Sequence, residues 1–226
     1  GGFRLTDGRQ TSLTVTQWVL EALYLTTALP ASGDQNSVPE SVTESAVYRS
    51  AVVFMKQCQH LVPAEEKYGA FQDYPVAHLP PAVPGESTPG IPRTTAFLTC
   101  AGLKGLIYAG IPFDSRHIQG ARSWLAGKYA VDANPGAGQT GYYTYILALT
   151  EALDALGTNR FTLADGSRRS WRRDVVRELL GRQKGNGSWR HERAEGWENH
   201  SELVTAYCIL ALERSAGPTV SVTHRS

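Results

Sequence analysis

Four short segments of this chain share one pattern, and this pattern limits the fold more than any other feature. Each segment ends in a small residue followed by leucine, and three of the four begin with threonine. The segments are TQWVLEAL (16–23), TCAGLKGL (99–106), ILALTEAL (146–153) and TAYCILAL (205–212). Repeated units of this kind bury their apolar faces by stacking on their neighbours. The sequence therefore predicts a stack of similar helical units.

Apolar residues recur with the helical period along most of the chain, and no convincing strand-like alternation is present. We predict an all-α fold with helices near residues 12–29, 41–61, 93–110, 114–129, 139–157, 171–184 and 200–215. Ser41 with Glu44 is typical of a capping box and favours the start of the second helix. Asp114 is the expected N-cap of the fourth helix, and Asn199 that of the seventh.

The composition is that of one globular domain, because 42% of the 226 residues are apolar and 19% are charged. We predict a single domain over residues 1–217, with a long proline-rich loop at 62–92 and a flexible tail at 218–226. The net charge of +1 provides no broad basic surface for nucleic acid. The chain also has no apolar run that would predict a membrane span.

A second motif follows the sixth predicted helix, where Gln183 precedes Gly187 and Trp189. This order resembles the QW repeat of squalene-hopene and oxidosqualene cyclases. A glutamine amide can bond the backbone at a helix end while a tryptophan ring covers that bond. We therefore expect the motif to connect adjacent helical hairpins.

Three other segments resemble partial copies of the QW repeat. Gln59 followed by Gly69-Ala70-Phe71 is a longer copy, and Trp124 stands in a copy where Tyr129 replaces the glutamine. Gly1-Gly2-Phe3 resembles the end of a copy whose first part is missing. Repeat units need neighbours or caps, so we expect either further hairpins upstream or self-association through the first helix.

The resemblance implies an α/α toroid, the fold of the squalene cyclase and protein prenyltransferase superfamily. In that fold, inner and outer helices alternate, and the inner ring surrounds a cavity that holds isoprenoid chains in the enzymes. Residues 134–143 also resemble a segment of uncharacterised bacterial prenyltransferase/squalene oxidase repeat proteins.

The sequence lacks the motifs that carry chemistry in these families. It contains neither the D-x-D-D acid motif of the hopene-type cyclases nor the Asp-x-Cys zinc ligands of the prenyltransferases. We therefore expect no metal and no cofactor. The three cysteines form no CxxC pair, and we expect Cys58, Cys100 and Cys208 to be buried free thiols.

The richest polar cluster lies between residues 189 and 202. As a site at a cavity mouth, it would use Glu198 as an acid and Trp197 and His200 as ligand-binding residues. The alternatives are a solvated loop between helices and a metal site formed by His191 and His200.

A tyrosine cluster is the second candidate site. Tyr142 and Tyr145 share one helix face, so they could line a cavity and stabilise a cation, or they could pack in the core. Asp132 is expected to be a turn residue, and because it stands on a tight loop between hairpins it is also kept as a weaker candidate acid.

These features lead to one predicted function and two alternatives. The first is a terpenoid cyclase-like toroid that binds an apolar, isoprenoid-like small molecule, with catalysis unproven because the usual acid motif is missing. The second is a non-catalytic repeat scaffold for protein–protein interaction, and the third is a polysaccharide-active α/α toroid.

Overall fold

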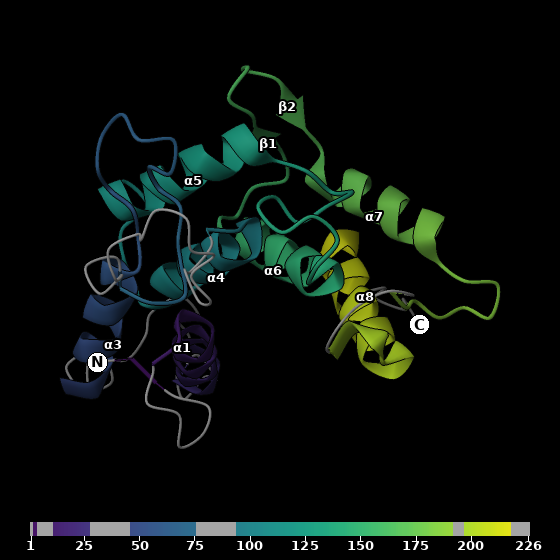
Figure 1. The fold of residues 1–226 in the computed structure, drawn as a ribbon, viewed down its shortest axis with the longest axis horizontal. Helices are drawn as coiled ribbons and strands as arrows, with labels where there is room; N and C mark the ends of the chain where they lie inside the picture. The colour runs from purple at the N-terminus through teal and green to yellow at the C-terminus, as the bar shows by residue number, and fades with distance from the viewer. Residues whose placement is uncertain (1, 4–10, 28–45, 76–93, 192–196, 218–226) are drawn as a thin grey trace, which may run out of the picture. The chain divides into compact units, whose positions relative to one another are not determined.

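The computed structural model describes residues 2–3, 11–27, 46–75, 94–191 and 197–217. These residues form seven α-helices, one short 3-10 helix and one two-stranded sheet, so the all-α prediction is confirmed (Figure 1). All seven predicted helices are present. Their bounds are α1 Leu13–Thr27, α3 Ala46–Gln57, α4 Ala96–Tyr108, α5 Arg116–Lys128, α6 Tyr142–Ala155, α7 Trp171–Arg182 and α8 Ser201–Ala216.

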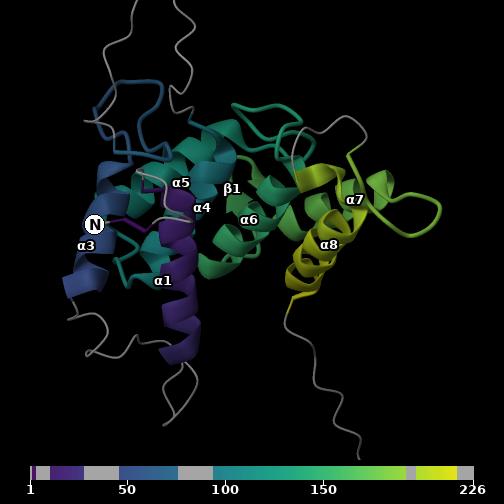
Figure 2. The same ribbon diagram turned by 60° about the horizontal axis from the view of Figure 1, so that its bottom comes forward.

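The chain folds into two compact units, Gly1–Tyr129 and Ala130–Ser226. In the first unit, α4 packs against α1, α3 and α5 (Figure 2). Two glycines of α4 allow this close packing, because a Cβ on Gly102 would lie 2.4 Å from the ring of Phe71 and one on Gly105 would lie 2.4 Å from Met55. The small residues of the repeat therefore mark close approaches to neighbouring segments.

In the second unit, α6 packs against α8, and α7 contacts both helices. The strands β1 Phe161–Thr162 and β2 Arg168–Arg169 pair antiparallel in the connection from α6 to α7. In each unit, the helices that carry the repeated segments therefore pack against one another. The prediction of a single toroid domain over residues 1–217 stays a prediction.

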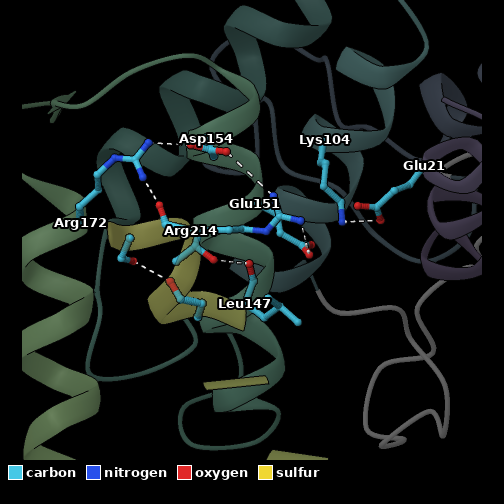
Figure 3. A network of polar contacts seen from close by, with 10 residues as sticks. Glu21, Lys104, Leu147, Glu151, Asp154, Arg172 and Arg214 are labelled. Atoms are coloured by element: carbon cyan, nitrogen blue, oxygen red, sulfur yellow. Dashed lines mark hydrogen bonds and ion pairs between the residues drawn. The ribbon is translucent and has the colours of Figure 1, made fainter. Parts of the chain in front are cut away.

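Buried or half-buried ion pairs join the repeat helices within each unit (Figure 3). In the first unit, Lys104 of α4 is almost fully buried and its Nζ lies 2.8 Å from the Glu21 carboxylate of α1. In the second unit, Arg214 of α8 lies 3.6 Å from Glu151 and 3.9 Å from Asp154 of α6. Polar side chains thus fix how adjacent repeat helices align.

The threonine that opens three of the repeated segments makes the same hydrogen bond in each case. Thr16, Thr99 and Thr205 accept on Oγ1 from the backbone N–H of an aromatic residue, at 2.9, 3.2 and 3.1 Å. The donors are the third residues of three Gly-x-aromatic sequences, namely Phe3, Phe71 and Trp189. The sequence repeat is therefore also a repeat in three dimensions.

The remaining segment, ILALTEAL (146–153), departs from this geometry at its first residue. Ile146 stands where the other segments have threonine, and its side chain has no hydrogen-bond acceptor. We number each repeat from this residue, so that Thr16, Thr99, Ile146 and Thr205 occupy position 1.

Two predicted N-caps are wrong. Ser115, and not Asp114, caps α5, because its side chain accepts from the backbone N–H of Ile118. The N-cap of α8 is His200, since Asn199 ends the preceding 3-10 helix, η2, at Trp197–Asn199. In both cases, the turn that leads into the helix is one residue longer than the polar pattern indicated.

Other predictions concern segments near the limits of the described structure. The capping box of Ser41 and Glu44, most of the proline-rich loop and the tail at 218–226 lie outside the described residues. Residues 62–75 form turns and contain no helix. The prediction of free, buried cysteines is confirmed for Cys58, Cys100 and Cys208.

Candidate ligand-binding site

The second unit contains an open pocket of about 560 Å3. Its lining comes from the start of α6, the end of α7 and the loop that follows α7. The lining residues are Gln139, Tyr143, Gly181, Arg182, Gln183, Lys184, Arg190 and His191. Three of these side chains are permanently cationic at neutral pH, and none is aliphatic. The pocket therefore favours an anionic or polar group over a purely apolar one.

Arg182 is held in one orientation by several partners. Its guanidinium donates to Glu178 at 2.7 Å, to the Gln139 amide oxygen at 3.0 Å and to the Asp132 backbone carbonyl at 2.7 Å. It also lies 3.9 Å from the centroid of the Tyr142 ring. Burial lowers the pKa of Arg182, but the hydrogen bond to Glu178 and the electrostatic interactions with Tyr142, Glu178 and Tyr143 together outweigh it, so the net pKa is raised. This side chain provides a fixed positive charge at the pocket wall.

Tyr143 is the tyrosine that lines the pocket. It is almost fully buried, and its ring meets that of Tyr142 edge to face, with centroids 4.9 Å apart. Burial raises the pKa of Tyr143, with a further contribution from Cys208. The phenol is therefore neutral at physiological pH and can act as a hydrogen-bond donor.

The two tyrosines of the predicted cluster, Tyr142 and Tyr145, form hydrogen bonds to the backbone. Tyr142 donates from its hydroxyl to the Val131 carbonyl at 2.9 Å, and Tyr145 donates to the Ala130 carbonyl at 2.6 Å. Both side chains are fully buried. They attach the loop before α6 to that helix, and Arg182 already occupies the face of Tyr142.

Glu198, the predicted acid, is buried next to the pocket. Only 5% of the residue is exposed, and its Oε1 accepts from both the backbone N–H and the hydroxyl of Thr144, at 2.9 and 3.0 Å. Thr144 is the third residue of α6, so the carboxylate caps the positive end of this helix. The backbone N–H of His191, which lines the pocket, donates to the Glu198 carbonyl at 3.3 Å.

The second carboxylate oxygen of Glu198 is different. Oε2 is buried, and it has no hydrogen-bond partner among the described residues. The charge of Glu198 adds to burial in raising the pKa of Tyr207 and, to about 12, that of Cys208. A buried carboxylate oxygen in this state can accept a hydrogen bond from a ligand.

Two of the remaining predicted site residues, Asp132 and His200, lie at the surface. Asp132 is exposed, and it is its backbone carbonyl that contacts Gln139 and Arg182. His200 is exposed at the start of α8. The side chain of Trp197 lies outside the described residues. Of the predicted acids, only Glu198 is buried and adjacent to a pocket residue.

The QW-like residues have structural roles. The Gln183 amide donates to the Gly187 carbonyl at 2.9 Å and closes the turn after α7, where Gly187 has a φ of +83°. The Trp189 indole donates to the Leu179 carbonyl near the end of α7 at 2.7 Å. The motif therefore attaches a loop to a helix end, but the bond to the helix comes from the tryptophan.

The longer copy in the first unit makes a wider set of contacts. Gln59 donates from its amide to the Gly69 carbonyl at 3.0 Å and to the His117 carbonyl of α5 at 2.9 Å. Its amide oxygen lies 2.7 Å from Nδ1 of His117. Gln59 thus connects the loop after α3 to the start of α5, as expected for a hairpin-joining residue. Trp124 is half-buried on α5.

The basic residues of the pocket were not among the predicted site residues. Arg182 and Lys184 flank Gln183 of the QW-like motif. An Arg-x-Lys pair next to a glycine-rich turn, with Arg190 shortly after it, was the available signal.

The described residues contain no group of three His, Cys, Asp or Glu side chains placed to hold a metal ion. No helix in the described ranges has the length and apolar character needed to cross a membrane.

Comparisons with protein-family models, curated proteins and solved structures find no match for this chain.

Proposed function

We propose that this protein is a ligand-binding helical-repeat domain whose pocket in the second unit holds the anionic end of a small molecule. The observation that carries the proposal is the cationic lining by Arg182, Lys184 and Arg190. A guanidinium fixed in advance loses little entropy on binding, which favours recognition of phosphate or carboxylate groups.

The scaffold in this proposal is an α/α toroid like that of the squalene cyclase and prenyltransferase superfamily. It is supported by the hydrogen bond from a Gly-x-aromatic segment to a helix threonine, which recurs at Thr16, Thr99 and Thr205. The packing of α1 on α4 and of α6 on α8 is also consistent with an inner layer of repeat helices.

An isoprenoid diphosphate is the ligand class that fits both the family resemblance and the charged pocket. The resemblance favours an isoprenoid chain, and the charged pocket favours a diphosphate over a neutral alcohol or a hydrocarbon. The pocket volume of about 560 Å3 is within the range of small-molecule sites. In this proposal, Glu198 supports the site by capping α6, and its Oε2 is available to a ligand donor.

Isothermal titration calorimetry tests the proposal with three probes: farnesyl diphosphate, inorganic diphosphate and farnesol. We expect farnesyl diphosphate to bind more tightly than farnesol, and its affinity to fall as NaCl is raised. The double variant Lys184→Ala/Arg190→Ala should bind about tenfold or more weakly, since each lost charge-assisted hydrogen bond is worth about 1.5–3 kcal/mol.

Arg173→Ala is the matched control, because Arg173 is an exposed arginine of α7 outside the pocket. Its affinity should equal that of the wild type. Equal binding of farnesol and farnesyl diphosphate, or equal affinities of the double variant and the control, would contradict an anion-binding pocket.

A further inference from the structure

The repeat helices of the first unit pack in a defined register. Gly105, at position 7 of α4, approaches Gln17, at position 2 of α1, so that an added Cβ would lie 3.2 Å from the Gln17 side chain. Tyr108, at position 10 of α4, stacks on Tyr24, at position 9 of α1, with centroids 4.7 Å apart. The later helix thus uses positions 7 and 10 against positions 2 and 9 of the earlier helix.

The second unit repeats the pairing of position 10 with position 9 and makes it with different side chains. Arg214, at position 10 of α8, lies 3.9 Å from Asp154 and 3.6 Å from Glu151, which occupy positions 9 and 6 of α6. Stacked aromatic rings in one unit are therefore replaced by ion pairs in the other, while the positions stay the same. Register is a property of the repeat and not of one pair of side chains.

Each repeat helix consequently has two packing faces. Positions 3, 7 and 10 lie on one helix face and form the incoming face, which in α4 and α8 contacts the earlier repeat helix of the same unit. Positions 2, 6 and 9 form the outgoing face, which in α1 and α6 contacts the later repeat helix, and position 5 borders it. The long side chain of Lys104, at position 6 of α4, also reaches back to Glu21 of α1. Helix α4 has its incoming face against α1, and α8 has its incoming face against α6.

The incoming face of α1 is exposed. It consists of Trp18, Ala22 and Leu25, of which Trp18 is 49% exposed and Leu25 is 53% exposed. The equivalent residues of α4 are Ala101, Gly105 and Tyr108, where Ala101 is buried. Large apolar side chains at positions 3 and 10 do not stabilise a helix when they face solvent. Such an exposed apolar patch is typical of an interface.

The outgoing face of α8 is exposed in the same way. Its residues are Ala206, Leu210 and Glu213, with Ile209 at the border, and Leu210 and Ile209 are 46% and 47% exposed. In the register of the second unit, position 10 contacts position 6. Leu25 of one incoming face would therefore meet Leu210 of one outgoing face, which joins two apolar side chains.

We propose that these two faces bind each other between copies of this chain, so that α8 of one copy docks on α1 of a second copy. The occupant is a second copy because the two exposed faces are the two halves of an interface that is already present in each unit. Such a head-to-tail contact uses different surfaces on the two partners, so it extends to a closed ring or to a chain of copies.

Sedimentation velocity of the full chain over a range of concentrations tests this proposal. The wild type should associate reversibly, with species larger than a dimer at high concentration. Leu25→Asp removes the incoming face and Leu210→Asp removes the outgoing face, so each variant alone should be monomeric. Both residues are about half exposed, and circular dichroism should show that the variants fold.

Mixing the two variants provides the decisive measurement. Leu25→Asp retains an intact α8 face and Leu210→Asp retains an intact α1 face, so an equimolar mixture should form a dimer and no larger species. Val53→Asp, at an exposed apolar residue of α3, is the control and should associate like the wild type. A monomeric wild type, or a mixture that stays monomeric, would overturn the proposal. Association that only Leu25→Asp abolishes would indicate a symmetric α1 contact and would overturn it as well.

Discussion

The backbone N–H of Phe71 donates to Oγ1 of Thr99 at 3.2 Å, and both residues are fully buried. The same hydroxyl donates to the Thr95 carbonyl at 2.9 Å, so one side chain satisfies a loop donor and a helix acceptor. Because Thr16 makes the same two kinds of bond, this arrangement connects each loop to the helix that follows it.

Replacing Thr99 with valine should destabilise the protein by about 1–3 kcal/mol, because the Phe71 N–H would be buried without a partner. Urea unfolding, followed by circular dichroism, measures this change. Thr162→Val, at an exposed position of β1, is the control and should change the free energy of unfolding by less than about 0.5 kcal/mol. Equal effects of the two substitutions would show that the repeated hydrogen bond is unimportant.

Trp189→Ala should lower the free energy of unfolding by about 3–5 kcal/mol, because the ring is buried and its indole bonds the end of α7. Trp189→Phe retains a smaller aromatic ring and removes the indole donor to Leu179, so its loss should be smaller than that of Trp189→Ala. Phe113→Ala, at an aromatic residue that is 53% exposed, is the matched control. A melting temperature unchanged by Trp189→Ala would show that the QW-like pattern has no structural role.

We expect the losses of stability caused by substituting Lys104 and Glu21 to be non-additive. Lys104→Met leaves the Glu21 carboxylate with Gln17 as its remaining partner in this cluster, at 2.9 Å, and should cost about 3 kcal/mol. Adding Glu21→Leu removes the uncompensated charge and should restore most of the loss. Chemical denaturation of the two single variants and the double variant measures the coupling, and strictly additive losses would contradict it.

We expect the folded protein to lose stability in mild acid because His117 becomes protonated more readily in the unfolded chain. Burial, with smaller contributions from the charges of Lys56 and Arg116, lowers the pKa of His117 from 6.5 to about 4. Between these values, the unfolded chain binds the proton and the folded chain does not. The stability provided by the neutral ring is therefore complete above pH 6.5 and declines as the pH falls toward 4.

Denaturation curves between pH 7 and pH 4.5 test this effect. The wild type should lose more stability over this range than His117→Gln, which cannot titrate. Burial and the nearby positive charges of Lys56 and Arg116 are the structural reasons for this preference. Parallel stability profiles for the two proteins would exclude His117 as the responsible group.

Squalene provides a test of activity. The chain contains no D-x-D-D sequence to protonate an alkene, and Glu198 is engaged by Thr144 through one oxygen. We expect incubation with squalene to yield no hopene by gas chromatography. A hopene-type cyclase assayed in parallel is the positive control, and cyclised product from this chain would contradict the expectation.

Local sequence patterns predict where the helices lie and which residues open the repeats. The helical period, the Gly-x-aromatic sequences and the threonines act over a few residues, so they are visible without a structure. The sequence also indicates that small residues of the repeats, such as Gly102 and Gly105, lie where neighbouring segments approach closely. The exact N-caps were not, because the length of the preceding turn decides whether Asp114 or Ser115 reaches the helix start.

The character of the candidate site depends on contacts between residues that are far apart in the sequence. Glu198 caps Thr144 across 54 residues, and Arg182 contacts Asp132 across 50 residues, so neither relation has a local signature in the sequence. Three similar tyrosines received different roles because the hydroxyls of Tyr142 and Tyr145 reach backbone carbonyls, whereas Tyr143 lines the pocket. The physical reason is that burial and hydrogen-bond partners depend on which helices meet, while residue type fixes only what each side chain is able to do.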